Sequence, residues 1–96
     1  MDLIRWLQNW YDRNCDGEWE HFHGVEIGTL DDPGWYVHID LKETPHGSLT
    51  MAELRRDADD DDWLHCRIED GIFKGTGDSQ KLEEILTRFK SLVEPS

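Results

Sequence analysis

The chain has 96 residues, of which 22 are acidic and 10 are basic, so its formal net charge is −12. This length predicts one domain, residues 1–96, and the charge repels nucleic acid and anionic membranes while favouring a basic protein partner. No apolar run approaches the roughly 20 residues of a membrane span, and the N-terminus has no secretory-signal pattern, so we expect a cytoplasmic protein.

The first predicted element is an amphipathic helix over residues 2–13. Apolar side chains recur there at the spacing of one helix face, and Asp2 can cap the first turn. Asn14 and Gly17 are typical of a helix end and the turn that follows it. The apolar stripe comprises Leu3, Trp6, Leu7, Trp10 and Tyr11.

Two runs with alternating apolar and polar residues, 24–30 and 35–42, predict an antiparallel hairpin. Residues 31–34, DDPG, are typical of a turn, in which Pro33 presets φ and Gly34 takes a positive φ. The core face of the second strand comprises Trp35, Val37, Ile39 and Leu41.

The middle of the chain has weaker patterns. Residues 43–48 are expected to form a loop. Residues 49–56 fit either a short helix that begins with a capping box, Thr50 to Glu53, or a third strand, which we favour because it completes a meander. The run 57–62 holds five acids in six positions, so we expect a solvated turn there.

The remaining strands are predicted at 63–69 and 72–74. The first turns Leu64, Cys66 and Ile68 inward, and Cys66 is expected to be a buried, reduced thiol. The second is a short edge strand that follows a glycine turn, and GTGD at 75–78 breaks it.

A second amphipathic helix is predicted over residues 79–94, with Asp78 as N-cap and Pro95 near its end. Its buried stripe comprises Leu82, Ile85, Leu86, Phe89 and Val93. The predicted fold is therefore α+β: an antiparallel sheet of about four strands flanked by an N-terminal and a C-terminal helix. One sheet face would pack on the helices, and the other would at least partly face water.

The segment DRNCDGEWEHFH, residues 12–23, begins like a calcium-binding EF-hand loop. Acidic or amide side chains stand on alternate residues and Gly17 follows them, but the last loop position is His23 in place of the bidentate Glu. A strand also replaces the expected second helix. The alternating residues are Asp12, Asn14 and Asp16.

The same segment contains residue types found in zinc sites and in catalytic sites. Cys15, His21 and His23 lie close in sequence but lack the paired spacing of zinc ligands. Glu18 and Glu20 share a face if the segment is extended and could work as a carboxylate pair, although exposed acids are usually plain surface. We therefore expect no bound metal, no cofactor and no enzymatic activity. A small Ca- or Zn-binding module, or a metal-dependent enzyme that uses 12–23, is the alternative.

Acidic residues stand beside tryptophan in CDGEWEH and DDPGW. An aromatic anchor with an acidic rim is a plausible protein-binding surface, although tryptophan is also a common core residue. We expect at least two of Trp19, Trp35 and Trp63 to lie in the core.

Residues 6–41, together with 59–77 and 81–89, resemble the immunity protein 53 family of bacterial polymorphic toxin systems. The resemblance covers nearly the whole chain and is strongest in CDGEWEH and DDPGW. It implies a cytoplasmic, non-enzymatic protein, monomeric or a small homo-oligomer, that binds a cognate toxin domain and neutralises it. A basic toxin domain would suit the acidic charge of this chain.

The residues that match the two motifs are the candidates for toxin contact and for structural roles. We expect Glu18, Glu20, Asp31 and Asp32 to form a contact rim, with the acidic run 57–62 as a second candidate. The toxin-binding candidates are Asp16, Glu18, Glu20, His21, Asp31 and Asp32. The structural candidates are Gly17, Trp19, Pro33, Gly34 and Trp35.

Overall fold

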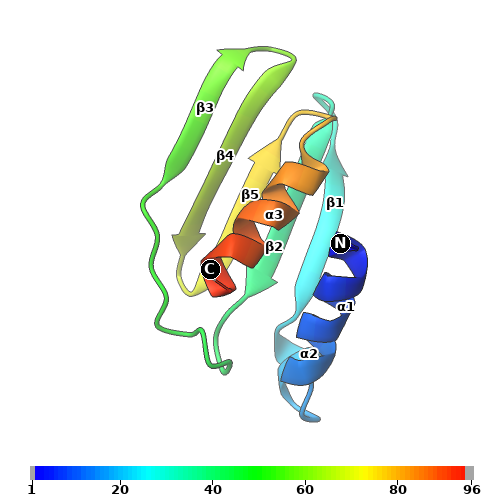
Figure 1. The fold of residues 1–96 in the computed structure, drawn as a ribbon, viewed down its shortest axis with the longest axis vertical. Coiled ribbons are helices and arrows are strands. Elements are labelled where there is room, and N and C mark those ends of the chain that lie inside the picture. The colour runs from blue at the N-terminus through cyan, green and yellow to red at the C-terminus, as the bar shows by residue number, and fades with distance from the viewer. Residues whose placement is uncertain (1, 95–96) are drawn as a thin grey trace.

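The computed structural model describes residues 2–94, which form a five-stranded antiparallel sheet and three helices (Figure 1). The α+β prediction is confirmed, with five strands where about four were expected. Pro95 lies outside the described residues. The elements are α1 (Leu3–Asn14), α2 (Trp19–Phe22), β1 (Val25–Leu30), β2 (Gly34–Asp40), β3 (Leu54–Asp59), β4 (Asp62–Glu69), β5 (Ile72–Gly77) and α3 (Leu82–Val93).

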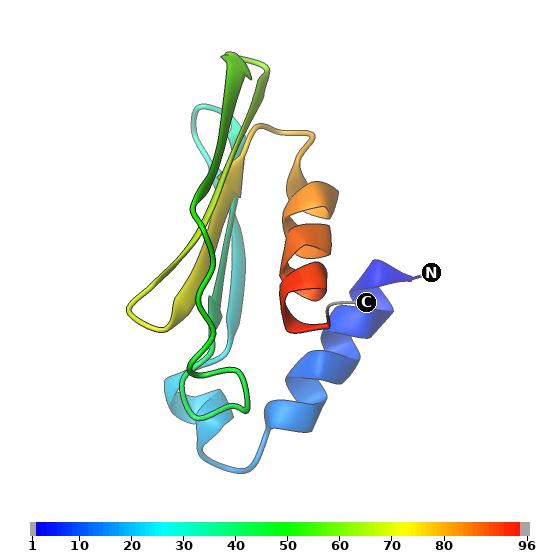
Figure 2. The same ribbon diagram turned by 60° about the vertical axis from the view of Figure 1, so that its left-hand side comes forward.

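Helices α3 and α1 form two successive layers over one sheet face, and α2 lies at the end of the sheet (Figure 2). Helix α3 packs on the sheet and α1 packs on α3, so the opposite sheet face is left without a helix (Figure 2). Both predicted helical stripes are largely confirmed, although Leu82 is only half-buried and Tyr11 is exposed. The buried members are Leu7 and Trp10 of α1 and Ile85, Leu86, Phe89 and Val93 of α3. Asp2 caps α1 as predicted, because its carboxylate accepts a hydrogen bond from the Arg5 backbone N–H at 3.1 Å.

The strand order is β1-β2-β5-β4-β3, so β5 lies in the centre of the sheet. The prediction of a short edge strand at 72–74, broken by residues 75–78, is wrong. Gly75 and Gly77 belong to β5, where they pair with both β2 and β4. Glycine is needed at both positions because the start of α3 approaches the strand closely. A Cβ atom at Gly75 would lie 2.5 Å from Cγ2 of Ile85, and one at Gly77 would lie 2.6 Å from Cβ of Lys81. These glycines make room for the helix and do not form a turn.

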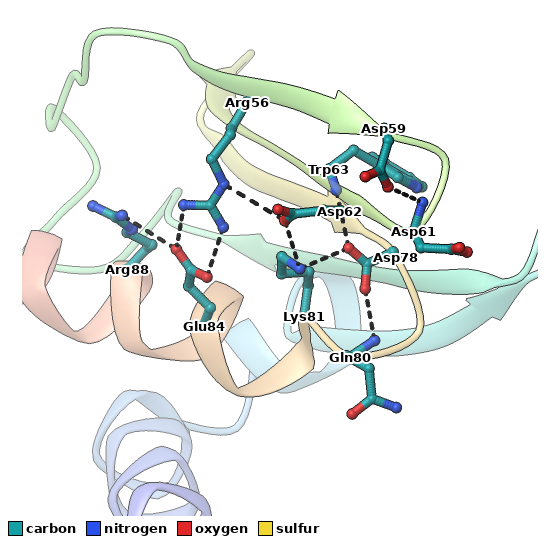
Figure 3. Close-up of polar contacts among 10 residues, drawn as sticks. All are labelled: Arg56, Asp59, Asp61, Asp62, Trp63, Asp78, Gln80, Lys81, Glu84 and Arg88. Atoms are coloured by element: carbon teal, nitrogen blue, oxygen red, sulfur yellow. Dashed lines mark hydrogen bonds and ion pairs between the residues drawn. The ribbon is translucent and has the colours of Figure 1, made fainter.

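The acidic run is mostly strand. Its turn is limited to Asp60 and Asp61, while β3 continues to Asp59 and β4 begins at Asp62, so the predicted six-residue turn is wrong. The strand interpretation of 49–56 is confirmed from Leu54 onward, but the expected meander is wrong, because β3 pairs with β4 and β2 pairs with β5. The hairpin tolerates its acids because it projects into solvent and because Asp62 lies 3.0 Å from the Lys81 ammonium group (Figure 3).

Helix α3 begins later than predicted, and Asp78 is not its N-cap. Lys81 occupies that position without a side-chain capping bond. The buried Asp78 carboxylate instead accepts hydrogen bonds from the backbone N–H groups of Trp63 and Gln80, both at 2.9 Å (Figure 3). Asp78 therefore joins the start of β4 to the turn that precedes α3.

Two expectations are corrected, one about the backbone of Gly34 and one about the burial of the tryptophans. Gly34 does not have a positive φ; it is buried, and a Cβ there would collide with the carbonyl oxygen of Gly77 on the neighbouring strand. Trp35 and Trp63 are only half-buried, so of the three tryptophans considered for the core only Trp19 is fully buried. The Trp35 indole N–H donates to the Ser79 carbonyl at 3.1 Å, which accounts for its place at the margin of the core.

Candidate protein-binding site

The predicted contact residues fall at the two ends of β1. The connection that holds Asp16 and Glu18 and the short helix α2 precede β1, whereas Asp31 and Asp32 lie in the turn after it. Figure 1 shows α2 and the β1–β2 turn at opposite ends of the sheet. The expected rim of acids from both motifs is therefore not one continuous surface, and each end has to be considered separately.

Two of the predicted contact acids hold the backbone that leads into α2. Asp16 Oδ1 accepts hydrogen bonds from the N–H groups of Glu18 and Trp19, both at 2.9 Å. Glu20 reaches back and accepts from the N–H groups of Asp16 at 3.0 Å and Gly17 at 2.8 Å. The arrangement resembles a capping box, in which two side chains satisfy the free N–H groups of a helix start.

These bonds change the properties of both acids. The N–H groups of Trp19 and Glu18 lower the pKa of the Asp16 carboxyl. Backbone N–H groups, first its own and then those of Asp16 and Gly17, lower the pKa of Glu20 against the opposing effect of desolvation. Gly17 has a φ of 96°, as its predicted turn position requires. Because residues 19–22 are helical, Glu18 and Glu20 do not share the face of an extended segment.

The most exposed large apolar side chain of the described residues is Phe22, at 80% exposure. It stands at the end of α2, while Trp19 of the same helix is buried. Phe22 lines two hollows, one of about 270 Å³ and one of about 370 Å³. The first is lined by Asp16, Glu18, Trp19, Phe22, His23 and Glu43, and the second by Phe22, His23, Gly24, Val25, Glu26, His38, Asp40 and Ile72.

This surface, named here the Phe22 site, consists of Phe22 and the carboxylates of the two hollows. An exposed aromatic ring surrounded by polar groups is the arrangement found at energetically dominant positions of protein interfaces. The sequence motifs point to tryptophan as the aromatic side chain that a partner would contact, and they do not identify Phe22. No local pattern marks Phe22, because its exposure depends on the helical turn at residues 19–22 and on the burial of Trp19.

A hydrogen bond between the side chains of His23 and Asp40 holds the backbone next to Phe22 in place. His23 Nδ1 lies 2.7 Å from Oδ2 of Asp40 at the end of β2, and both side chains are at least four-fifths buried. The other oxygen of Asp40 accepts from the Lys42 N–H at 2.9 Å. Together with the burial of Trp19, this contact attaches α2 to the end of the sheet, so the Phe22 site rests on a fixed support.

The opposite end of the sheet carries a further acidic hollow, of about 570 Å³, lined by Asp32, Asp57, Asp59, Asp60 and Trp63. The structure thus brings Asp32 next to the second predicted contact, the run 57–62. Asp59 is partly engaged, since it accepts from the Asp61 N–H at 2.7 Å, and Trp63 is half-buried (Figure 3). This end has the charge of a contact surface but no apolar side chain as exposed as Phe22.

The metal-site alternative gains no support. Across the described part of the chain, no three histidine, cysteine, aspartate or glutamate side chains are arranged to hold a metal ion. Cys15 Sγ donates to the Tyr11 carbonyl at 3.3 Å, and Asp16 is engaged with backbone N–H groups. Cys66 is buried as predicted, and desolvation raises its pKa to about 11. Between residues 2 and 94, no helix has the length and apolar character needed to cross a membrane.

Comparison with known proteins gives one match. The sequence model of a family described as immunity protein 53 matches residues 4–94 of the 96-residue chain. No curated protein and no solved structure matches the chain. The matched region includes both motifs and all five strands.

Proposed function

We propose that this chain, which belongs to the immunity protein 53 family, binds a cognate bacterial toxin domain and neutralises it by occupying its surface. The chain acts by binding alone, in the cytoplasm, and needs no metal or cofactor. The toxin domain carries a basic surface that surrounds or adjoins its active site. Three observations support this assignment: the family membership, the net negative charge and the Phe22 site.

The exposure of Phe22 is the observation that carries the choice of surface. Burying a phenylalanine side chain contributes roughly 1.5–3 kcal/mol, so an exposed ring next to two hollows is a strong anchor for a partner. Glu18 and Glu43 line one of the two hollows, and Glu26 lines the other. Basic side chains of the toxin would meet these carboxylates around a central apolar contact.

The support under the Phe22 site favours tight binding. Asp16 and Glu20 fix the start of α2, and His23 is bonded to Asp40, so little conformational entropy is lost when a partner binds there. The net charge of −12 adds electrostatic steering, which can bring association rates to about 10⁸–10⁹ M⁻¹s⁻¹ at low salt. A fast and tight inhibitor suits protection from a toxin that acts inside the cell.

Co-expression in bacteria tests this function. Cells that express the toxin domain encoded by the adjacent gene should survive when they also express this chain. The double variant Phe22→Ala/Glu18→Lys should protect poorly while accumulating to the same level as the wild type. Death of cells that contain abundant wild-type protein would contradict the proposed function, and full protection by the double variant would contradict the proposed surface.

A further inference from the structure

The outer edge of β1 is the second feature of the molecule that suits a partner. In the strand order, β1 and β3 are the two edge strands of the sheet, and β1 pairs with β2 alone. Edge strands expose backbone N–H and C=O groups that can pair with another chain, so folded proteins usually protect them.

The register identifies the backbone groups that β1 exposes. The Gly24 carbonyl accepts from the Asp40 N–H at 3.0 Å, and the same antiparallel register pairs Glu26 with His38 and Gly28 with Tyr36. Hydrogen-bonded pairs alternate along an antiparallel ladder, so the even-numbered residues of β1 bond to β2. The N–H and C=O groups that point away from the sheet belong to Val25, Ile27 and Thr29.

The two edges differ in their protection. Strand β3 carries four charged residues in six, and its register shifts between Asp57 and Asp59, which disrupts a regular edge. Strand β1, VEIGTL, carries one charge, pairs with β2 without a shift, and leaves Ile27 38% exposed. Charges and bulges are the usual means of blocking strand addition, and β1 has almost none of them.

The charges at the two ends of β1 indicate which strand fits. Asp16, Glu18 and Glu20 precede β1 in the sequence, and Asp31 and Asp32 follow it. A second copy of the chain is disfavoured, because antiparallel pairing centred on Ile27 would bring Asp31 and Asp32 of one copy against the Phe22 site of the other. A strand with basic residues near both ends is complementary to this edge.

We propose that an extended segment of the cognate toxin, with basic residues near both ends, adds to β1 as a sixth strand and bonds to the outward backbone groups of Val25, Ile27 and Thr29. The proposal rests on the proposed function and specifies how the partner is held. Backbone pairing of this kind supplies affinity, and side chains at the ends of the strand supply specificity. The docked segment would continue the Phe22 site along the sheet edge.

Amide hydrogen exchange tests the proposal in the complex with an inactivated form of the toxin domain encoded by the adjacent gene. In the free protein, the amides of Val25, Ile27 and Thr29 should exchange rapidly and those of Glu26 and Gly28 slowly. In the complex, the three outward amides should slow at least tenfold. If the toxin binds and these amides stay fast, the edge proposal is overturned while the proposed function stands; if the toxin does not bind at all, both are overturned.

A proline substitution gives an independent test. Thr29→Pro removes one outward N–H without removing a bond to β2, and its ring obstructs the edge. It should weaken toxin binding at least tenfold with an unchanged melting temperature, whereas Thr29→Val should bind normally. Equal binding by both variants would overturn the proposal. A free protein that is dimeric, with the outward amides already protected, would also overturn it, because the edge would then serve self-association.

Discussion

The carboxylate of Asp78 lies 2.7 Å from the ammonium group of Lys81, and these side chains are only 6% and 13% exposed. Lys81 also reaches Asp62 at 3.0 Å, so one lysine connects the start of α3 to the β3–β4 hairpin (Figure 3). Desolvation by itself would raise the pKa of Asp78, but the hydrogen bonds from Lys81, Gln80 and Trp63 outweigh it and lower the pKa to about 2.

This pKa predicts a loss of stability in acid. The Asp78 pKa is about 2 in the folded protein against an ordinary 3.8, so the folded state binds fewer protons over this range. The contribution of Asp78 is therefore complete above pH 3.8 and is lost as the pH falls to about 2, by roughly 2 kcal/mol. Urea unfolding across this range measures it. Asp78→Asn should show a shallower pH dependence, and an unchanged slope would contradict the assignment.

A second prediction concerns the space between α3 and β5. Gly75→Ala should lower the free energy of unfolding by about 1–3 kcal/mol, because the added methyl group would lie 2.5 Å from Cγ2 of the buried Ile85. Gly28→Ala is a matched control, since its methyl group meets the Tyr36 ring on the sheet face that has no helix. That ring can move aside, so we expect a smaller loss. Equal losses in urea unfolding would show that the close approach of α3 is unimportant.

A third prediction separates the structural acids from the contact acids. Glu20→Ala leaves the N–H groups of Asp16 and Gly17 without their acceptor, so it should lower the melting temperature by a few degrees. Glu18→Ala removes an exposed carboxylate and should leave the melting temperature unchanged. Calorimetry of the two variants compares them directly. Identical melting temperatures would mean that the bonds of Glu20 do not stabilise α2.

The helices and the first hairpin could be predicted because their patterns are local. The apolar spacing of α1, the cap at Asp2 and the alternation in β1 and β2 depend on neighbours in sequence, and these predictions are confirmed. The path of β5 could not be predicted, because Gly75 and Gly77 resemble a turn until α3 is placed over them. The role of Asp78 could not be predicted either, because its partner Trp63 belongs to β4, which is distant from Asp78 in the sequence.

In the candidate site, too, some features follow from local sequence and others depend on tertiary contacts. The shared face of Glu18 and Glu20 requires CDGEWEH to be extended, whereas a single helical turn forms there. That turn depends on the reciprocal bonds of Asp16 and Glu20 and on the burial of Trp19 under the rest of the fold. The exposure of Phe22 follows from this tertiary arrangement, so composition alone did not reveal it.

A fourth prediction distinguishes local contact from the overall charge. Glu18→Lys and Asp60→Lys each change the net charge from −12 to −10, so they alter long-range steering about equally. Glu18 lies at the Phe22 site and Asp60 at the opposite end of the sheet. In surface plasmon resonance with the toxin domain, Glu18→Lys should also raise the dissociation rate, by about tenfold. Equal dissociation rates would mean that only the overall charge matters.

The affinity of the Phe22→Ala variant for the toxin domain tests the central claim most directly. Its matched control is Ile4→Ala, because Ile4 is also exposed but lies on α1 beside Leu82 of α3, away from the Phe22 site. Isothermal titration calorimetry should show a dissociation constant raised roughly 30-fold for Phe22→Ala, as expected for an interface anchor worth about 2 kcal/mol, and little change for Ile4→Ala. Dissociation constants within about twofold of the wild type for both variants would contradict the claim that Phe22 anchors the toxin.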